Sequence, residues 1–287
     1  MGQALADCVW PARAILGEGP LWSSRDRALY WVDIRSPALH RYAPDDGARH
    51  SWPMPQTLGW VIERRDRSGF IAGFKAGFAE LDLDPPAIRP IGDPEPHLPR
   101  NRRNDAKADS KGRIWAGSMD EDEQIDSGGL WRLDPDLSWS LMDVGYQVAN
   151  GPAFSPDGSI LYHTDSAKRV IYRFELDPTG NLHDRRVHIQ FEEAWGYPDG
   201  MTTDAEGGLW VAHWDGARVS RFSPDGVLDR WIDLPVSRPT SCAFGGEDLD
   251  RLFITSASIG REDEALAGGL FEVDPAARGL PAEMFAG

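Results

Sequence analysis

Short apolar or alternating runs, separated by polar turns, recur along the whole chain and predict many short β-strands. Residues 150–165 are representative. The strand-like run "NGPAF" leads into the polar turn "SPDG", and the more apolar run "ILYHTD" follows. A third run with aromatic alternation, "VIYRFELDP", and a fourth, "VHIQFEE", complete the unit. No helical periodicity of useful length interrupts this pattern, so the fold class is all-β.

The same unit occurs six times, and its first residues are spaced 40 to 49 positions apart. These first residues are Glu18, Leu58, Asn104, Asn150, Asp199 and Thr240. Four short strands in a repeat of about 40–50 residues are typical of a β-propeller blade. The sequence therefore predicts a six-bladed β-propeller with four-stranded antiparallel blades around a central channel. A β-sandwich or a two-domain all-β protein would not require six matching units.

The two ends of the chain complement each other in this scheme. The sixth unit has no convincing fourth strand after "FEVDP", whereas the N-terminal "DCVWPARAI" is strand-like and precedes the first unit. We expect this N-terminal strand to close the last blade, because closure removes exposed strand edges. Residues 1–287 then form a single propeller domain.

Composition narrows the range of partners. The net charge is −16, which disfavours nucleic acid and anionic membranes because phosphate binding needs clustered lysine and arginine. The chain has no run of 18 apolar residues, and its first residues lack the features of a signal peptide. Two cysteines imply no disulfide framework. We expect a cytoplasmic protein.

The candidate chemistry lies at the first position of each unit. In a propeller the first strands line the channel, so these six residues should meet at one mouth. Five of the six carry side-chain oxygens and two are acids. Converging carboxylates repel each other unless a cation neutralises them, and hard oxygen ligands suit Ca²⁺, Mg²⁺, Mn²⁺ or Fe²⁺.

For any single residue of this set, ordinary turn chemistry would be sufficient. The joint pattern on a closed ring is what predicts a metal site. Residues at the ends of the second strands should return to the same mouth and could support the ligands. They are Asp33, Phe74, Ser118, Asp165, His213 and Ser256.

Four motifs then carry a resemblance to a known family. They are "LGEGPLW", "RRNDAKADSKGRIWAGSM", "VANGPAFSPDG" with "LYHTDS", and "YPDGMTTDAEGGLWVA". Together, and in this order along nearly the whole chain, they resemble the SMP-30/gluconolactonase/LRE-like family, which contains regucalcin and bacterial sugar lactonases. The length and the "YHTD" segment are most similar to bacterial aldonolactonases of pentose and hexose catabolism.

The resemblance implies one catalytic divalent cation, with Ca²⁺, Mg²⁺, Mn²⁺, Zn²⁺ and Fe²⁺ as candidates. The family's metal ligands correspond to Glu18, Asn150 and Asp199. Its substrate contacts correspond to Arg102, to Asn104, and to an acidic residue after "GSM". That acidic residue is Glu121 or Asp122, and the sequence does not distinguish them.

The implied reaction is hydrolysis of a sugar lactone to the aldonic acid, as in gluconolactonases, xylonolactonases and arabinolactonases. The cation would polarise the lactone carbonyl. Either Asp199 or a metal-bound hydroxide would activate the attacking water. No "GxSxG" motif is present, so no serine nucleophile is implied.

Two alternatives remain open at this stage. One is a metal-dependent esterase or organophosphatase on the same fold, and the other is a non-catalytic calcium-binding propeller. The expected partner is a small sugar lactone, with no nucleic acid and no membrane. Members of the family are often monomers, and we expect a monomer.

Overall fold

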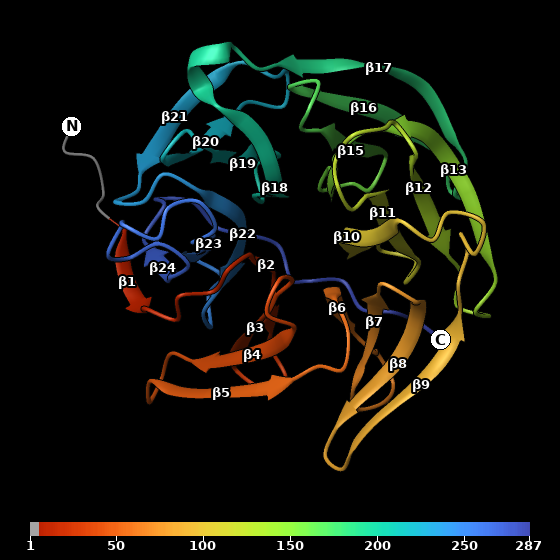
Figure 1. The fold of residues 1–287 in the computed structure, drawn as a ribbon. Coiled ribbons are helices and arrows are strands. Elements are labelled where there is room, and N and C mark those ends of the chain that lie inside the picture. Colours follow the sequence, from red (N-terminus) through yellow and green to blue (C-terminus); the bar gives the residue numbers. More distant parts are fainter. Residues whose placement is uncertain (1–5) are drawn as a thin grey trace.

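Six four-stranded antiparallel sheets form a ring in residues 6–287, the part of the chain that the computed structural model describes (Figure 1). The prediction of an all-β six-bladed propeller is confirmed. Residues 1–5, the start of the stretch weighed as a signal peptide, lie outside the described residues.

Strands occupy the first five blades in sequence order from the channel outward. The inner strands are β2 (Gly17–Ser23), β6 (Leu58–Glu63), β10 (Asn101–Ala108), β14 (Ala149–Phe154), β18 (Tyr197–Thr203) and β22 (Pro239–Gly245). The second strands are β3 (Ala28–Asp33), β7 (Phe70–Phe74), β11 (Ile114–Asp120), β15 (Ile160–Asp165), β19 (Leu209–Trp214) and β23 (Arg251–Ser256).

The third and fourth strands lie farther from the axis. The third strands are β4 (Ala38–Ala43), β8 (Gly77–Leu83), β12 (Gly128–Leu133), β16 (Val170–Leu176), β20 (Arg218–Phe222) and β24 (Leu270–Val273). The outer strands are β5 (Ala48–Pro53), β9 (Pro86–Gly92), β13 (Trp139–Tyr146), β17 (Leu182–Gln190), β21 (Leu228–Asp233) and β1 (Asp7–Trp10).

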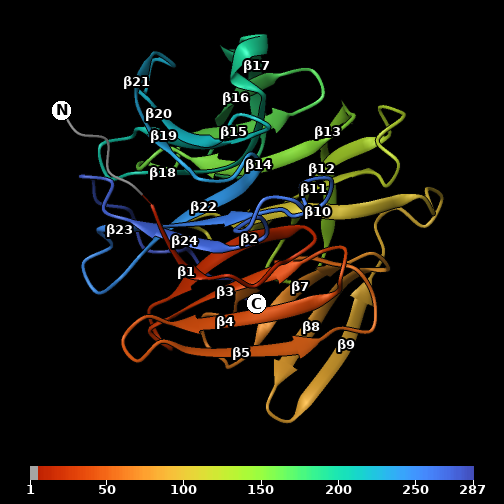
Figure 2. The same cartoon turned by 60° about the vertical axis from the view of Figure 1, so that its left-hand side comes forward.

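The sixth blade combines both ends of the described chain. Its strand order is β22, β23, β24 and β1, and β1 pairs with β24 in antiparallel register, with Cys8 opposite Phe271. Trp10 of β1 then packs edge-on against Trp31 of the first blade, with ring centroids 5.5 Å apart. The two views of the ribbon show β1 beside β24 (Figures 1 and 2).

Helix is almost absent from the described residues. One short 3-10 helix, η1 (Glu193–Trp195), precedes β18. No helix within residues 6–287 has the length and apolar character needed to cross a membrane.

Apolar clusters fill the spaces between blades. The cluster between the fifth and sixth blades is typical: Trp210 and Val219 of one blade meet Phe244 and Ile254 of the next. Five further clusters lie at the other junctions. Burial of one large apolar side chain contributes about 1.5–3 kcal/mol, so these junctions hold the ring together. They leave the inner-strand side chains near the axis free for other roles.

The C-terminal segment closes one end of the channel. It crosses the ring from the sixth blade to the second and third (Figure 1). Phe285 is fully buried, its N–H donates to Glu63 O at 2.8 Å, and its carbonyl accepts from Arg65 N. Leu280 to Glu283 line a cavity of about 150 Å³ at this end. The predicted ring of site residues lies at the opposite end.

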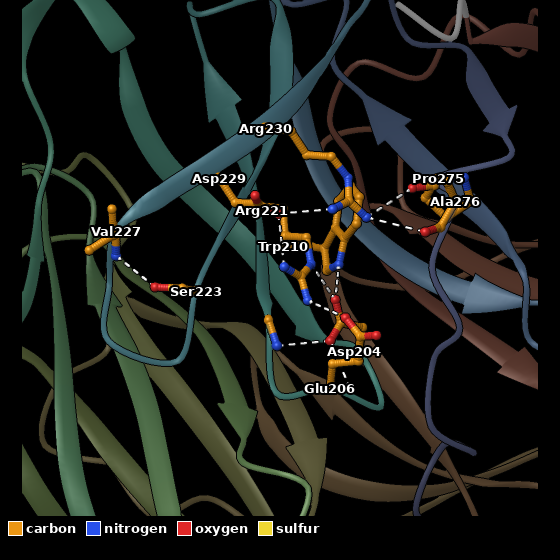
Figure 3. Close-up of polar contacts among 11 residues, drawn as sticks. Asp204, Glu206, Trp210, Arg221, Ser223, Val227, Asp229, Arg230, Pro275 and Ala276 are labelled. Carbon is orange, nitrogen blue, oxygen red and sulfur yellow. Dashed lines mark hydrogen bonds and ion pairs between the residues drawn. The ribbon is translucent and has the colours of Figure 1, made fainter. Parts of the chain in front are cut away.

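A buried polar network repeats in two blades and ties a turn to the blade interior. In the fifth blade Asp204 Oδ2 accepts from Trp210 Nε1 (2.9 Å) and from Arg221 Nε (2.6 Å) (Figure 3). In the third blade Asp109 Oδ2 accepts from Trp115 Nε1 (2.8 Å) and from Arg113 Nε (2.6 Å). In the motifs "DSKGRIW" and "DAEGGLW", each aspartate therefore accepts a hydrogen bond from the tryptophan six residues later.

We predict that Asp204→Ala lowers the free energy of unfolding by about 2–4 kcal/mol, because it leaves the Nε–H of Arg221 and the buried indole N–H of Trp210 without their acceptor. Urea unfolding at neutral pH measures the loss. The control is Glu206→Ala: Glu206 contacts the same arginine, but its side chain is 83% exposed. The control should cost at most about 1 kcal/mol. Equal losses in the two variants would contradict the network's role.

Candidate metal centre and substrate pocket

A pocket of about 510 Å³ opens at the mouth opposite the C-terminal segment, within the size range of small-molecule sites. Five of the seven predicted site residues line it, and they come from four inner strands. They are Glu18 of β2, Arg102 and Asn104 of β10, Asn150 of β14 and Asp199 of β18. All five are at most 6% exposed.

The other two ring positions do not contribute polar groups to the pocket. Leu58 is fully buried in the cluster between the first two blades. Thr240 donates its hydroxyl to Gly17 O and contacts Thr255 Oγ1 at 2.9 Å. The site is therefore built by the first, third, fourth and fifth blades, and the other two close the ring beside it.

Every inner strand has a register irregularity at this mouth. The shift lies between Glu18 and Leu21 in β2, and between Asn150 and Ala153 in β14. The other four inner strands have it at the same level. Such bulges bend a strand and redirect side chains. Gly19 (φ +55°) and Gly151 (φ +78°) have the left-handed backbone that glycine tolerates best, which explains why glycine follows Glu18 and Asn150.

A chain of hydrogen bonds fixes the two amides of the site. Arg102 donates to Asn104 Oδ1, and Asn104 Nδ2 donates to Asn150 Oδ1 at 2.9 Å. Asn150 Nδ2 in turn donates to Ser166 Oγ at 2.9 Å. Because each amide nitrogen is committed in one direction, the orientation of each amide oxygen is set.

The two ring carboxylates are buried beside each other without a basic partner. Burial raises the pKa of Glu18 to about 8, and the charge of Asp105 adds to this increase. Burial, followed by the charge of Glu18, raises the pKa of Asp199 well above its ordinary value. Within residues 6–287 neither carboxylate forms a salt bridge. This is the environment that a cation would relieve.

The donor chemistry fits a hard divalent cation. Glu18 and Asp199 supply carboxylate oxygens and Asn150 supplies an amide oxygen, the ligand types that such ions prefer. The described residues contain no group of three histidine, cysteine, aspartate or glutamate side chains arranged to hold a metal. A site here would therefore depend on Asn150 as well as on the two acids.

Residues at the ends of the second strands hold the chain segments that lead into the site. Asp33 accepts from Ile15 N (2.8 Å) and Leu16 N (3.1 Å), just before Glu18. His213 Nδ1 lies 2.8 Å from Trp195 O, four residues before Asp199.

Asp165 accepts from Gln147 N and Val148 N, both at 3.3 Å, just before Asn150. These groups position the approach to three inner strands, whereas Phe74 packs in an apolar cluster and Ser118 and Ser256 form hydrogen bonds elsewhere.

The acidic turn after β11 differs from the sequence expectation. Glu121 pairs with Lys75 and with Arg35 Nη1 (3.2 Å), and Asp122 pairs with Arg100 Nη2 (2.6 Å). Neither lines the pocket. These pairs hold surface loops together, although Glu121 is close enough to Arg102 for their charges to interact.

Glu123 is the acidic residue of this turn that does line the pocket. Its backbone is left-handed (φ +57°), which is uncommon for glutamate and is held by two hydrogen bonds. Its N–H donates to Asp120 O (3.0 Å), and its carbonyl accepts from Gln147 Nε2 (2.7 Å). The run "DEDE" offered no local signal for choosing it.

Aromatic side chains complete the walls. Tyr197 and Trp214 line the pocket, and Arg169 stacks over the Tyr197 ring at 4.1 Å from its centroid. Asp215, also at the rim, is paired with Arg238 and Arg261 at 2.8 and 2.9 Å. The rim is thus fixed by cation–π and ionic contacts, while the floor has the unpaired carboxylates.

Comparison with known proteins relates this chain to a family. A family model described as the SMP-30/Gluconolactonase/LRE-like region matches residues 16–258. A 6-deoxy-6-sulfogluconolactonase of Pseudomonas putida is 39% identical over 262 residues, covering 91% of this chain and 89% of the relative. An L-arabinolactonase of Azospirillum brasilense is 38% identical over 296 residues, covering 100% and 96%.

A solved structure of a luciferin-regenerating enzyme is similar over 99% of both chains, with a TM-score of 0.94 and 30% sequence identity. The likeness extends over the inner strands that build the pocket as well as over the outer ones.

We predict that Glu18→Gln raises the free energy of unfolding of the chelator-treated protein by about 1–2 kcal/mol, because it removes one of three buried acids, the other two being Asp105 and Asp199. Asn150→Asp should have the opposite effect, since it adds a further buried carboxylate. Urea unfolding in chelator at pH 8 measures both. A loss of stability in Glu18→Gln would mean that the ionised carboxylate is already compensated.

Proposed function

This chain belongs to the SMP-30/gluconolactonase/LRE-like family, and from that premise we propose that it hydrolyses a sugar lactone to the aldonic acid. The observation that carries the proposal is the floor of the pocket. There two buried, unpaired carboxylates, two oriented amides and a buried guanidinium converge from four inner strands. The names of the relatives, a sulfogluconolactonase and an arabinolactonase, support the same substrate class.

Glu18, Asn150 and Asp199 would hold one divalent cation. When bound, the cation supplies a Lewis acid that polarises the lactone carbonyl. Their oxygens suit Ca²⁺, Mg²⁺ or Mn²⁺, and Zn²⁺ and Fe²⁺ are further candidates. The family membership and the donor set support this assignment.

Asp199 is the candidate general base. One oxygen of its carboxylate could bind the cation while the other accepts a proton from the attacking water. Water adds to the carbonyl carbon, the ring C–O bond breaks, and the departing oxygen takes a proton. The products are the open-chain acid and its free hydroxyl group.

Arg102 and Asn104 are the candidate substrate contacts. Burial lowers the pKa of Arg102 to about 10, so the guanidinium stays cationic at neutral pH. Its Nε has no hydrogen-bond partner among the described residues. A buried unpaired donor favours a ligand oxygen, because leaving it unpaired is costly. Hydroxyl groups of an open or cyclic sugar supply such oxygens.

The deciding experiment follows acid release from pentono- and hexonolactones by the chelator-treated protein, with Ca²⁺, Mg²⁺, Mn²⁺, Zn²⁺ or anaerobic Fe²⁺ restored singly. We expect cation-dependent hydrolysis above the spontaneous rate, and a fall of at least about 100-fold in kcat for Asp199→Asn. Rates that equal the spontaneous background with every lactone and every ion would contradict the proposal.

Glu123 provides a second test, directed at substrate binding. We expect Glu123→Gln to raise KM by about 10-fold with little change in kcat, because a hydrogen bond to a charged group is worth about 1.5–3 kcal/mol. Asp122→Asn is the matched control from the same turn, and it should change KM less than twofold. A larger effect at Asp122 than at Glu123 would return the role to one of the two residues expected from the sequence.

A further inference from the structure

A buried carboxylate lies directly below the pocket where most blades have no side chain at all. Asp105 follows Asn104 in β10 and is 2% exposed. The corresponding residues of the other five inner strands are Gly19, Gly59, Gly151, Gly200 and Ser241. The third blade alone has a charged group at this level.

The position points toward the next blade around the ring. A Cβ at Gly59 would lie 2.6 Å from Arg103 O of the third blade, and one at Gly200 would lie 2.2 Å from Ser241 Oγ of the sixth. Asp105 follows the same rule, and its Oδ2 accepts from Gly151 N of the fourth blade at 3.0 Å. The carboxylate therefore links two adjacent inner strands directly.

Asn104 and Asp105 together form hydrogen bonds with three consecutive residues of β14. Asn104 Nδ2 donates to Ala149 O (2.7 Å) and to Asn150 Oδ1 (2.9 Å). Asp105 Oδ2 accepts from the N–H of Gly151. Carbonyl, side-chain amide and N–H on three successive residues are thus all held from β10. Asn150 is the middle residue of the three, so its amide cannot turn or move without breaking one of these hydrogen bonds.

Asp105 has its own internal support. Its Oδ1 accepts from Ala106 N at 2.8 Å, and Lys107, two residues on, lines the same lower cavity. Asp105 and Lys107 both line the cavity of about 150 Å³ near the C-terminal segment. Asp105 is therefore held in place without lining the upper pocket, which makes it a support and not a ligand.

We propose that Asp105 is a positioning residue of the metal centre: it holds Asn150 through the Gly151 N–H, so that the amide oxygen is presented to a divalent cation together with Glu18 and Asp199. This inference rests on the metal centre of the proposed function, although not on which substrate is hydrolysed. Groups that orient a metal ligand commonly change metal affinity by about 10–100-fold when removed.

The test measures binding of Mn²⁺ alone to the chelator-treated full chain, by the electron paramagnetic resonance signal of the free ion. We expect Asp105→Asn to raise the dissociation constant by at least about 10-fold. Asp105→Ser, which copies Ser241 of the sixth blade, serves as a second variant, and tryptophan fluorescence verifies the fold of each. Asp157→Asn, an acid of an exposed turn, controls for the loss of one negative charge and should change affinity less than twofold.

A double-mutant cycle with Asn150→Ala separates positioning from simple charge. If Asp105 acts through Asn150, Asp105→Asn should have little further effect once Asn150 is alanine. Full additivity of the two substitutions would overturn the proposal, as would wild-type affinity in folded Asp105→Asn or absence of Mn²⁺ binding by the wild type. Failure of lactone hydrolysis with intact Mn²⁺ binding would count against the proposed function only.

Discussion

The packing of each blade against the next is the constraint on which the rest of the structure depends. Each of the six junctions is an apolar cluster shared by two blades, and closure through β1 and β24 makes the ring continuous. Because the junctions supply the stability, the side chains at the axis need not be apolar. Polar groups can then converge there, since rigid strands hold them at fixed distances whatever their mutual repulsion.

The six blades do not contribute equally to the polar groups near the axis. Four blades supply polar groups to the pocket. In the other two, Leu58 packs in an apolar cluster and Thr240 donates a hydrogen bond to Gly17 O. Negative charge accumulates near the axis, with Glu18, Asp105 and Asp199 all buried. Arg102 and Lys107 oppose it from β10. The arrangement is costly in the absence of a cation, and such cost is characteristic of sites selected for binding and not for stability.

Much of this architecture could be predicted from the sequence, because the repeat fixes the blades and the blades fix which residues share a mouth. The convergence of Asn104 and Asn150, 46 positions apart, follows from that alone. Glu123 could not be found in this way. It lies in a turn with four successive acids, and its selection depends on a left-handed backbone that only the surrounding contacts impose. The crossing of the C-terminal segment was also beyond prediction, since an extended tail has no periodicity to indicate what it covers.

Asp105 illustrates a different limit and a way past it. Beside Asn104 in the "ND" pair, it has no local feature that separates a support from a ligand. Comparison between blades does separate them, because the other inner strands have glycine or serine at this level and use it for close approach. In a repeat fold, the other repeats therefore show which residue is usual at each position. A side chain that departs from the internal pattern, is buried, and reaches the neighbouring blade is a candidate for a functional role, and here the residue it reaches is the neighbour of Asn150.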